Sequence, residues 1–372
     1  MGIHPEFTTD PAAWLTHNAP DGPVFFFSSR ALTETFLFFR DNFPGMVTYA
    51  VKANPAPQVL QTLCRAGMTA FDVASPNEME RVRAVCPAAQ LHYHNPVRSL
   101  SEIAVAKGFG IASWSIDRAS ELDKLGDIAG QEIAVRLKLP VKGAAYDFGS
   151  KFGADPDTAA ALLRRVVQRG GVPSMTFHPG TQCDDPAPWR RYIEACAEVA
   201  LAAGVRLHRL NVGGGFAAFR TAKAPDLQGV FTAIAETATR AFGPDCPDLV
   251  CEPGRAMVSE AYTLALTVKA VSDEAVFLDD GLYGALMEWR DLPAPERITV
   301  LAPDGAPRRA APAPRVVFGP TCDSLDRLPE PLPLPRDLAE GDRLLVRGMG
   351  AYSLCLGTGF NGYGMPRTID LE

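Results

Sequence analysis

The segment YAVKANP, residues 49–55, places one charged residue directly after a run of β-forming side chains. The run before Lys52 is apolar, and Ala53, Asn54 and Pro55 follow the lysine at once. A lysine is almost never fully buried unless its ammonium group is paired or used in chemistry. In a partly desolvated pocket a lysine can attack a carbonyl group and form a Schiff base. Lys52 is therefore the first candidate catalytic residue.

Further residues that could bind a ligand, through polar side chains or through backbone N–H groups, stand at the ends of other β-rich runs. They are Asp72 with Glu78 just beyond it, Arg136, His178, Gly213, Gly214, Gly215, Glu252 and Arg255. A triple glycine lets a ligand approach backbone N–H groups closely, and an arginine can bind phosphate through two hydrogen bonds. A phosphate site, a lysine, a histidine and a buried acid together suit pyridoxal 5'-phosphate (PLP).

Each of these groups has a use in a PLP site. Lys52 would bond the cofactor, and Glu252 would keep its pyridine nitrogen protonated. His178 would stack on the ring, while Arg255 and the glycines would hold the phosphate.

The elements that must position these residues are β-rich runs that alternate with helix-like segments. The runs are 46–52, 69–74, 90–95, 111–116, 133–139, 174–180, 209–214 and 248–253. Strands that alternate with helices predict βαβ units and a parallel sheet, and about eight units predict a closed (β/α)8 TIM-like barrel. The active site of such a barrel lies at the carboxyl ends of its strands, where the candidate residues stand.

The pattern changes after residue 258. Strand-like runs follow without long helices between them, and the stretch 292–335 is rich in proline, which favours turns and sheet edges. We predict a PLP-binding barrel over 29–258 and a separate, mainly antiparallel β domain formed by 1–28 and 259–372. The glycine-containing segment 141–155, after the fifth barrel strand, predicts a mobile lid.

Seven motifs, in order along the chain, resemble the fold-type III PLP-dependent decarboxylases, and especially their ornithine decarboxylase-like group. They are YAVKANP (49–55), FDVAS (71–75), FHPGTQ (177–182), NVGGGF (211–216), CEPGRAM (251–257), FGPTCDSLD (318–326) and MGAYSLCLGTGFNGY (349–363). The resemblance implies PLP-dependent decarboxylation of a basic L-amino acid. L-Ornithine, which would give putrescine for polyamine biosynthesis, is the first expected substrate, and L-lysine, alone or beside ornithine, is the alternative.

The resemblance also implies roles for matching residues. Lys52 matches the Schiff-base lysine, His178 the histidine on the cofactor ring, and Cys322 the cysteine that reprotonates the α-carbon after carbon dioxide leaves. Cofactor contacts are expected from Asp72, Arg136, Thr181, Gly213, Gly214, Gly215, Glu252, Pro253, Gly254, Arg255 and Tyr352. Asp323 matches the acid that receives the distal amine of the substrate, and Phe360 is a further expected substrate contact. In the family, Cys322 and Asp323 reach into the site of the partner subunit, which implies a homodimer with two shared active sites.

One substrate-binding acid is not placed by the motifs. The family's second such acid lies a little beyond a DGxYG turn, present here at 280–284, and the following segment is about one residue shorter. Asp291 is the nearest candidate, and Glu288 is the alternative. The preferred length of the substrate stays open at this point.

Composition and cysteine spacing indicate which binding partners and which cellular compartment to expect. The net charge of −7 and the absence of a basic tract argue against a nucleic-acid partner. No apolar run approaches the ~18 residues needed to span a bilayer, and no signal peptide is evident. The eight cysteines are scattered without a C-x-x-C pair, so we expect neither a metal site nor a disulfide framework, but a reduced cytoplasmic protein.

Other functions share part of the pattern. An alanine racemase would use the barrel but leaves Cys322 and Asp323 unexplained, and a non-catalytic PLP carrier would leave the β domain without a purpose. A metal-dependent barrel hydrolase would need more ligands for His92 and His94, which share one face of a strand and have no evident carboxylate partner. A diaminopimelate decarboxylase places a glutamate after the cysteine, whereas Asp323 suits a substrate that ends in an ammonium group.

Overall fold

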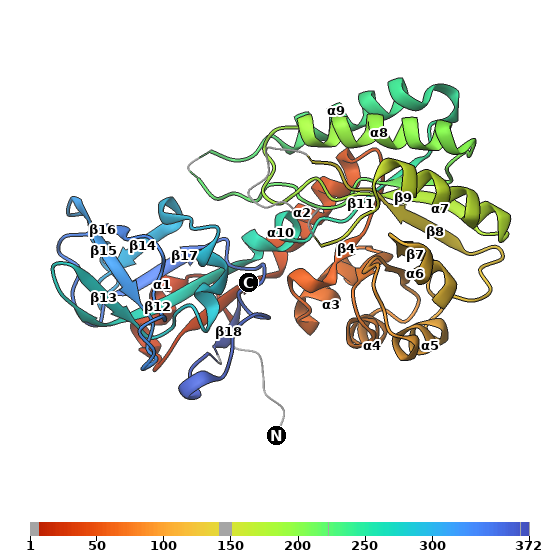
Figure 1. Ribbon diagram of the computed structural model, residues 1–372. Coiled ribbons are helices and arrows are strands. Elements are labelled where there is room, and N and C mark those ends of the chain that lie inside the picture. The colour runs from red at the N-terminus through yellow and green to blue at the C-terminus, as the bar shows by residue number, and fades with distance from the viewer. Residues whose placement is uncertain (1–6, 141–150, 222, 365, 372) are drawn as a thin grey trace. The chain divides into compact units, whose positions relative to one another are not determined.

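The computed structural model describes residues 7–140, 151–221, 223–364 and 366–371 (Figure 1). The chain divides into two compact units. The barrel unit consists of Thr35–Ala217 and Pro225–Met257, and the β unit consists of Met1–Glu34, Ala218–Ala224 and Val258–Glu372. Each unit is described below by itself.

The barrel unit is built on one parallel sheet. Its strands are β3 (Gly45–Val47), β4 (Tyr49–Ala50), β5 (Ala70–Val73), β6 (Gln90–Tyr93), β7 (Ser113–Ile116), β8 (Glu132–Arg136), β9 (Val172–Thr176), β10 (Arg209–Asn211) and β11 (Asp248–Cys251). They pair in the order β3-β11-β10-β9-β8-β7-β6-β5-β4. Because β3 and β4 are two halves of one strand, interrupted at Thr48, the sheet closes on itself with eight strand positions. The predicted (β/α)8 barrel is confirmed.

The first strand closes the barrel by pairing on both sides. Leu249 and Val250 of β11 lie opposite Gly45 and Met46, while β4 pairs with β5. Beyond the interruption, the Thr48 backbone N–H donates to Cys251 at 2.9 Å. A Cβ atom on Gly45 would lie only 2.1 Å from the Leu249 carbonyl oxygen, so the closure depends on a glycine there.

Helices surround the barrel. They are α2 (Ser29–Asn42), α3 (Pro57–Arg65), α4 (Pro76–Val85), α5 (Leu100–Gly108), α6 (Ala119–Lys124), α7 (Pro156–Gln168), α8 (Ala187–Ala203) and α9 (Leu227–Phe242), with the short α10 (Arg255–Val258) after the last strand. Helices α8 and α9 run side by side (Figure 1). Ser75 and Ser99 cap α4 and α5 by accepting from backbone N–H groups three residues on.

An aromatic cluster between these helices anchors the glycine-rich turn after β10. Phe216 directly follows Gly215 and stacks on Trp189 of α8, with ring centroids 5.1 Å apart. It also meets Phe39 and Phe231 edge-on, each at 5.6 Å. The turn is therefore held from one side by buried rings, which fixes its backbone relative to the barrel.

The expectation that the chain forms no disulfide is wrong, because the structure joins Cys64 to Cys86. Their Cα atoms lie 6.2 Å apart and their separation in the sequence is 22 residues. Cys64 lies in the last turn of α3 and Cys86 follows α4 directly. One βα unit separates the two positions, so successive helices bring them together although no local cysteine motif exists.

The β unit contains a second sheet. Its strands are β1 (Phe7–Thr8), β2 (Val24–Ser28), β12 (Tyr262–Val271), β13 (Ala275–Leu278), β14 (Ile298–Leu301), β15 (Pro312–Phe318), β16 (Leu332–Pro335), β17 (Arg343–Arg347) and β18 (Arg367–Leu371), with α1 (Pro11–Asn18) on the chain between β1 and β2. Five of its strand pairings are antiparallel and three are parallel, so the sheet is mainly antiparallel as predicted. The early strand β2 joins this sheet between β18 and β12.

Besides the two-residue β1, the strands β16 and β18 of the β unit were not expected from the sequence. Strand β16 lies within the proline-rich stretch and forms the last strand of the main pairing path. Pro333 and Pro335 lie opposite Pro314 and Pro312 of β15, so proline faces proline in this register. Strand β18 begins only at Arg367 and pairs in parallel with β2.

Residues 141–150 of the expected lid lie outside the described residues. The part that is described, 151–155, is held at Gly153, whose N–H donates to Asp117 at 3.0 Å. Among the described helices, none combines the length and the apolar character that crossing a membrane requires.

We predict that Gly45→Ala weakens the barrel, because the added Cβ would force β3 away from the Leu249 carbonyl. Overpacking of this kind typically costs about 1–3 kcal/mol. The midpoint of urea unfolding should fall accordingly. Gly108→Ala is the matched control, since its Cβ would meet nothing within 4 Å in α5. Equal midpoints for the two variants would show that close packing at Gly45 does not hold the barrel shut.

Candidate active site

Lys52 lies one turn beyond the strand that leads to it. Strand β4 ends at Ala50, and Val51–Ala53 form a 3-10 turn in which both flanking residues are buried and Lys52 is exposed. The Tyr49 hydroxyl donates to the Asn54 carbonyl at 3.1 Å and holds the turn. The turn therefore presents the lysine at the carboxyl end of the barrel instead of burying it in the strand.

Glu252, directly after β11, forms the centre of a buried polar cluster. Its Oε1 accepts hydrogen bonds from His94 Nδ1 and from Asn211 Nδ2. His94 follows β6, Asn211 ends β10 and Glu252 follows β11, so residues at the ends of three strands meet at one carboxylate oxygen. Burial alone would raise the pKa of Glu252, but the charge and hydrogen bond of His94, the charge of Lys52 and the Asn211 amide lower it to about 2. Glu252 is therefore a carboxylate.

The orientation of Asn211 is set by its other bond. Its Oδ1 accepts from the Gly213 backbone N–H at 2.9 Å, so Nδ2 must point toward Glu252. Asn211 thereby couples the acid to the start of the glycine-rich turn. Neither Asn211 nor His94 was assigned a role from the sequence, although both stand where a β-rich run ends.

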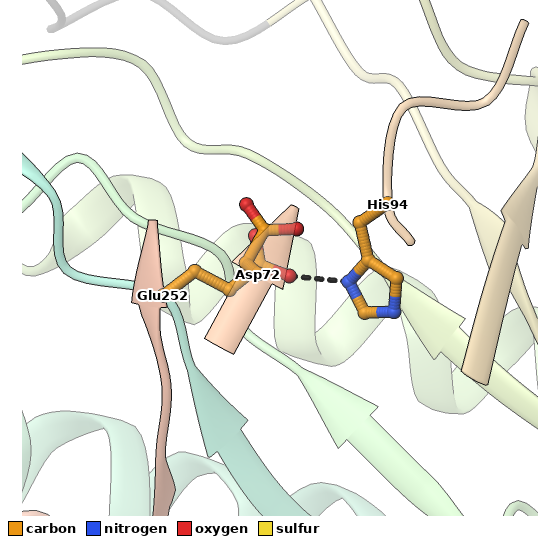
Figure 2. Close-up of side chains that lie close together, drawn as sticks. All are labelled: Asp72, His94 and Glu252. Atoms are coloured by element: carbon orange, nitrogen blue, oxygen red, sulfur yellow. Dashed lines mark hydrogen bonds and ion pairs between the residues drawn. The ribbon is translucent and has the colours of Figure 1, made fainter. Parts of the chain in front are cut away.

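Asp72 of β5 is a second carboxyl group beside this cluster, and Figure 2 shows it next to Glu252 with the His94 ring directed at Glu252. Burial, followed by the charge of Glu252, raises the pKa of Asp72 to about 7, although Lys52 and His94 oppose the shift. Its Oδ1 has no hydrogen-bond partner among the described residues. The site thus contains two acids whose environments drive their pKa values apart.

The contact between His94 and Glu252 corrects the expectation that His92 and His94 have no carboxylate partner. His94 does have carboxylate partners, and ligand atoms of Asp72, His94 and Glu252 all lie within 4.8 Å of one another. A cation could bridge such a set, but His94 Nδ1 is already engaged in a hydrogen bond with Glu252. Lys52 adds positive charge nearby, since it lowers the pKa of both acids. We therefore do not assign these residues as metal ligands.

His178 follows β9 and is a neutral imidazole. Burial, then the charges of Lys52 and Arg136, lower its pKa to about 3. Its Nδ1 accepts from the Gly180 N–H at 3.3 Å. Arg136 ends β8, and its guanidinium lies 5.3 Å from the centre of the Phe152 ring. Both side chains come from neighbouring strands, as the sequence predicts.

The turn Gly213–Gly215 packs so closely that side chains are excluded. Gly213 and Gly215 have φ angles of 71° and 85°. A Cβ on Gly213 would lie 2.2 Å from the Phe177 carbonyl, and one on Gly214 would lie 2.7 Å from the Glu252 carbonyl. A Cβ on Gly254 would approach Ala53 to 3.0 Å, so the segment that carries Pro253 and Arg255 lies against the Lys52 turn.

These residues fit PLP. An ionised acid, an unprotonated histidine and a lysine meet at the carboxyl ends of the barrel strands. A bare-backbone turn and an arginine follow the seventh and eighth strand positions, which is where barrels of this type bind phosphate. Thr181 lies in the turn between β9 and α8, and we leave its contact to the cofactor as an expectation.

The expected substrate residues gather within the β unit. The Tyr283 hydroxyl donates to Asp323 Oδ2 at 2.6 Å, and the Leu325 N–H donates to Oδ1 at 2.9 Å. The Tyr283 hydrogen bond lowers the pKa of Asp323, which is therefore ionised. Cys322 is exposed, and its N–H donates to Asn361, next to Phe360. The Phe360 ring lies 5.4 Å from that of Tyr283.

Asp326 holds the two loops of this group together. Its buried carboxylate accepts from the Leu282 N–H at 2.8 Å and from the Thr321 hydroxyl at 2.8 Å. The loop of Tyr283 and the loop of Cys322 and Asp323 therefore share one anchor. Tyr352, expected near the phosphate, lies in the β unit with a φ of 64°.

The two candidates for the second substrate acid are engaged by arginines. Glu288 is buried and forms an ion pair with Arg220. Asp291 accepts from its neighbour Arg290, with the shortest bond at 2.7 Å. An acid already committed to a buried ion pair is a poor receptor for a substrate ammonium group, so Glu288 loses support relative to Asp291.

The chain matches the family described as pyridoxal-dependent decarboxylase, pyridoxal binding domain, over residues 30–259. It is 31% identical to the ornithine decarboxylase of Panagrellus redivivus over 385 residues, covering 96% of this chain and 87% of that protein. It is 30% identical to the lysine/ornithine decarboxylase of Selenomonas ruminantium over 376 residues, covering 94% and 90%. The crystal structure of lysine/ornithine decarboxylase complexed with cadaverine from Vibrio vulnificus has a TM-score of 0.84 and 26% identity, covering 98% of this chain and all of that one.

Fold and site together thus define a PLP-dependent carboxy-lyase. The chain belongs to the PLP-dependent decarboxylases of the ornithine decarboxylase group, as its motifs predict. This assignment sets aside the racemase, the carrier protein and the metal-dependent hydrolase.

We predict that Asp72→Asn stabilises the cofactor-free protein more at pH 8 than at pH 5. The pKa of Asp72 is raised from 3.8 to about 7 in the folded state, chiefly by burial. The stability it contributes is therefore complete below pH 3.8 and lost as the pH rises through 7, by about 1.4 kcal/mol per pH unit within that window. Asparagine cannot ionise and escapes this loss.

Thermal unfolding of both proteins at the two pH values measures the effect. Asp157→Asn, which changes an exposed acid in the first turn of α7, is the control and should show a small, pH-independent difference. The same difference between wild type and Asp72→Asn at pH 5 and pH 8 would contradict the raised pKa.

Proposed function

We propose that the protein decarboxylates a basic L-amino acid, with L-ornithine as the preferred substrate and putrescine and carbon dioxide as products. The observation that carries this proposal is the ionised Asp323 in the β unit. Tyr283 and the Leu325 N–H fix it, and it stands beside Cys322. A fixed carboxylate suits a substrate whose far end is an ammonium group, and not one that ends in a second carboxylate.

Within the barrel, each residue has a task in this proposal. Lys52 would bind the cofactor through Nζ, and Gly213–Gly215 with Arg255 would hold its phosphate. The Glu252 carboxylate would accept a hydrogen bond from the protonated pyridine nitrogen, and the neutral His178 would cover the ring. When bound, PLP supplies an electron sink for the electron pair that is released as the bond to carbon dioxide breaks.

The β unit supplies the remaining steps in this proposal. Asp323 would bind the distal ammonium group and set the substrate in register. The exposed Cys322 thiol would return a proton to the α-carbon after carbon dioxide has left. Phe360, which packs against Tyr283, would line the substrate's path.

Asp323 and Cys322 would serve the barrel of a second copy of this chain, which makes the working unit a homodimer. The family motifs of Cys322 and Asp323 support this arrangement. A symmetric dimer of this kind would hold two active sites, each built from both protomers.

L-Lysine is the second candidate substrate, because two of the similar proteins are named lysine/ornithine decarboxylases. The deciding experiment offers ornithine, lysine, arginine and meso-diaminopimelate in competition and identifies the amines formed. Putrescine as the main product supports the proposal, and mainly cadaverine would assign the enzyme to lysine. A product from meso-diaminopimelate alone would contradict the role of Asp323.

We predict that Asp323→Ala lowers kcat/KM for ornithine by on the order of ten-fold or more, since the substrate ammonium group would lose its charged partner. Asp323→Glu should lose less, because the carboxylate is kept. Asp273→Ala, which removes an exposed acid between β12 and β13, is the control and should behave as the wild type. Unchanged kcat/KM for both ornithine and lysine in Asp323→Ala would direct the search to Asp291.

We predict that Lys52→Ala and Cys322→Ala are each nearly inactive but restore activity when mixed. A heterodimer of the two variants has one site with both residues intact. Random assortment should recover up to about a quarter of wild-type activity. Subunit exchange is checked by mass spectrometry of differently tagged chains. Exchange without recovered activity would place Lys52 and Cys322 in the site of one chain.

A further inference from the structure

A chain of hydrogen bonds leads from Glu252 into the barrel wall through two histidines. His94 Nδ1 bonds Glu252, and His94 Nε2 lies 2.8 Å from the Ser113 hydroxyl. The same hydroxyl lies 2.8 Å from His92 Nδ1. The chain therefore runs Glu252–His94–Ser113–His92, and every member is largely shielded from solvent.

The protons of this chain have one consistent placement when His94 is charged. A charged His94 donates from Nδ1 to Glu252 and from Nε2 to Ser113. Ser113 then donates its own proton to His92 Nδ1, which requires a neutral His92. Burial, followed by the charge of His94, lowers the pKa of His92 to about 3, in agreement with that state.

The acids around His94 favour its charged form. Burial by itself would lower the pKa of His94, but the charge and hydrogen bond of Glu252, then the charges of Asp72 and Glu132, outweigh burial and raise it. The other groups that face the ring are neutral: Asn211 lies 3.0 Å from Nδ1, and Ser113 and His92 continue the chain. One buried imidazolium thus balances the carboxylate in the middle of the barrel.

The two oxygens of Glu252 are used unequally. His94 and Asn211 both donate to Oε1, and no hydrogen bond from the described residues ends on Oε2. Two donors on one oxygen prevent the carboxylate from rotating. The other oxygen remains for a donor that the described hydrogen bonds do not supply.

We propose that His94 is a positioning residue for the cofactor: it holds Glu252 ionised and fixed through Oε1, so that Oε2 can accept a hydrogen bond from the protonated pyridine nitrogen. This inference rests on the role of Glu252 in the proposed function. Without the imidazolium, burial would favour the neutral carboxyl group. A neutral carboxyl group cannot stabilise a positively charged ring nitrogen, so protonation of that nitrogen depends on a residue that does not touch it.

The test measures the protonation of the ring nitrogen itself. The holoenzyme is prepared with PLP labelled with 15N in the ring, and the nitrogen chemical shift is followed by NMR across a pH series. In His94→Gln, which keeps a hydrogen-bond donor but removes the charge, the ring nitrogen should lose its proton at a pH lower by about one unit or more. That shift is a ten-fold change in the ratio of protonated to unprotonated cofactor at a given pH.

His92→Gln is the matched control, because His92 is also buried and bonds the same Ser113 hydroxyl but does not take part in the hydrogen bonds to Glu252. It should leave the ring nitrogen as in the wild type. Glu252→Gln should abolish the protonated signal. If Glu252→Gln changes the signal and His94→Gln does not, the inference about His94 is overturned while the role of Glu252 stands. If neither variant changes the signal, the inference about His94 and the role of Glu252 are both wrong.

A second measurement does not require a variant at residue 94. In the wild-type protein without cofactor, 15N histidine NMR should show the His94 pKa above that of an ordinary histidine, and Glu252→Gln should lower it. An imidazole that is neutral at pH 6 in the cofactor-free wild type would overturn the inference. This readout also stands if His94→Gln fails to fold.

Discussion

Closure of the barrel at the split first strand is the constraint on which the site depends. Gly45–Val47 pairs with the last strand and Tyr49–Ala50 with the second, so both ends of the sheet meet within six residues. The chain then turns at Val51–Ala53 and presents Lys52 over the barrel. Residues as distant as Asp72, Asn211 and Glu252 converge only because this closure brings the first and last strands together.

Two buried acids inside the barrel, Glu252 and Asp72, have different pKa values because their surroundings differ. Glu252 receives two hydrogen bonds and a neighbouring imidazolium, and these overcome the cost of burial. Asp72 has an oxygen without any partner among the described residues, so burial dominates and its pKa rises to about 7. One carboxyl group therefore stays ionised across the physiological range, while the other changes its proton within it.

The sequence predicts this fold well because each barrel strand is a short apolar run followed by a helical segment. Lys52, His178 and Glu252 could be placed because each follows such a run within a recognisable motif. His94 could not be linked to Glu252, since 158 residues separate them and only the closed sheet makes them neighbours. The disulfide between Cys64 and Cys86 was not predicted for a similar reason, and β16 was missed because its prolines are more typical of loops than of strands.

The prolines of β16 also affect whether another strand can pair with this edge of the sheet. Pro333 and Pro335 face Pro314 and Pro312, and a proline pair cannot exchange N–H bonds, so both ring nitrogens of β16 point away from β15. The outward side of this strand therefore lacks the alternating donors that a new strand needs. A sheet finished in this way resists the edge-to-edge growth that leads to aggregation, although its last strand remains open.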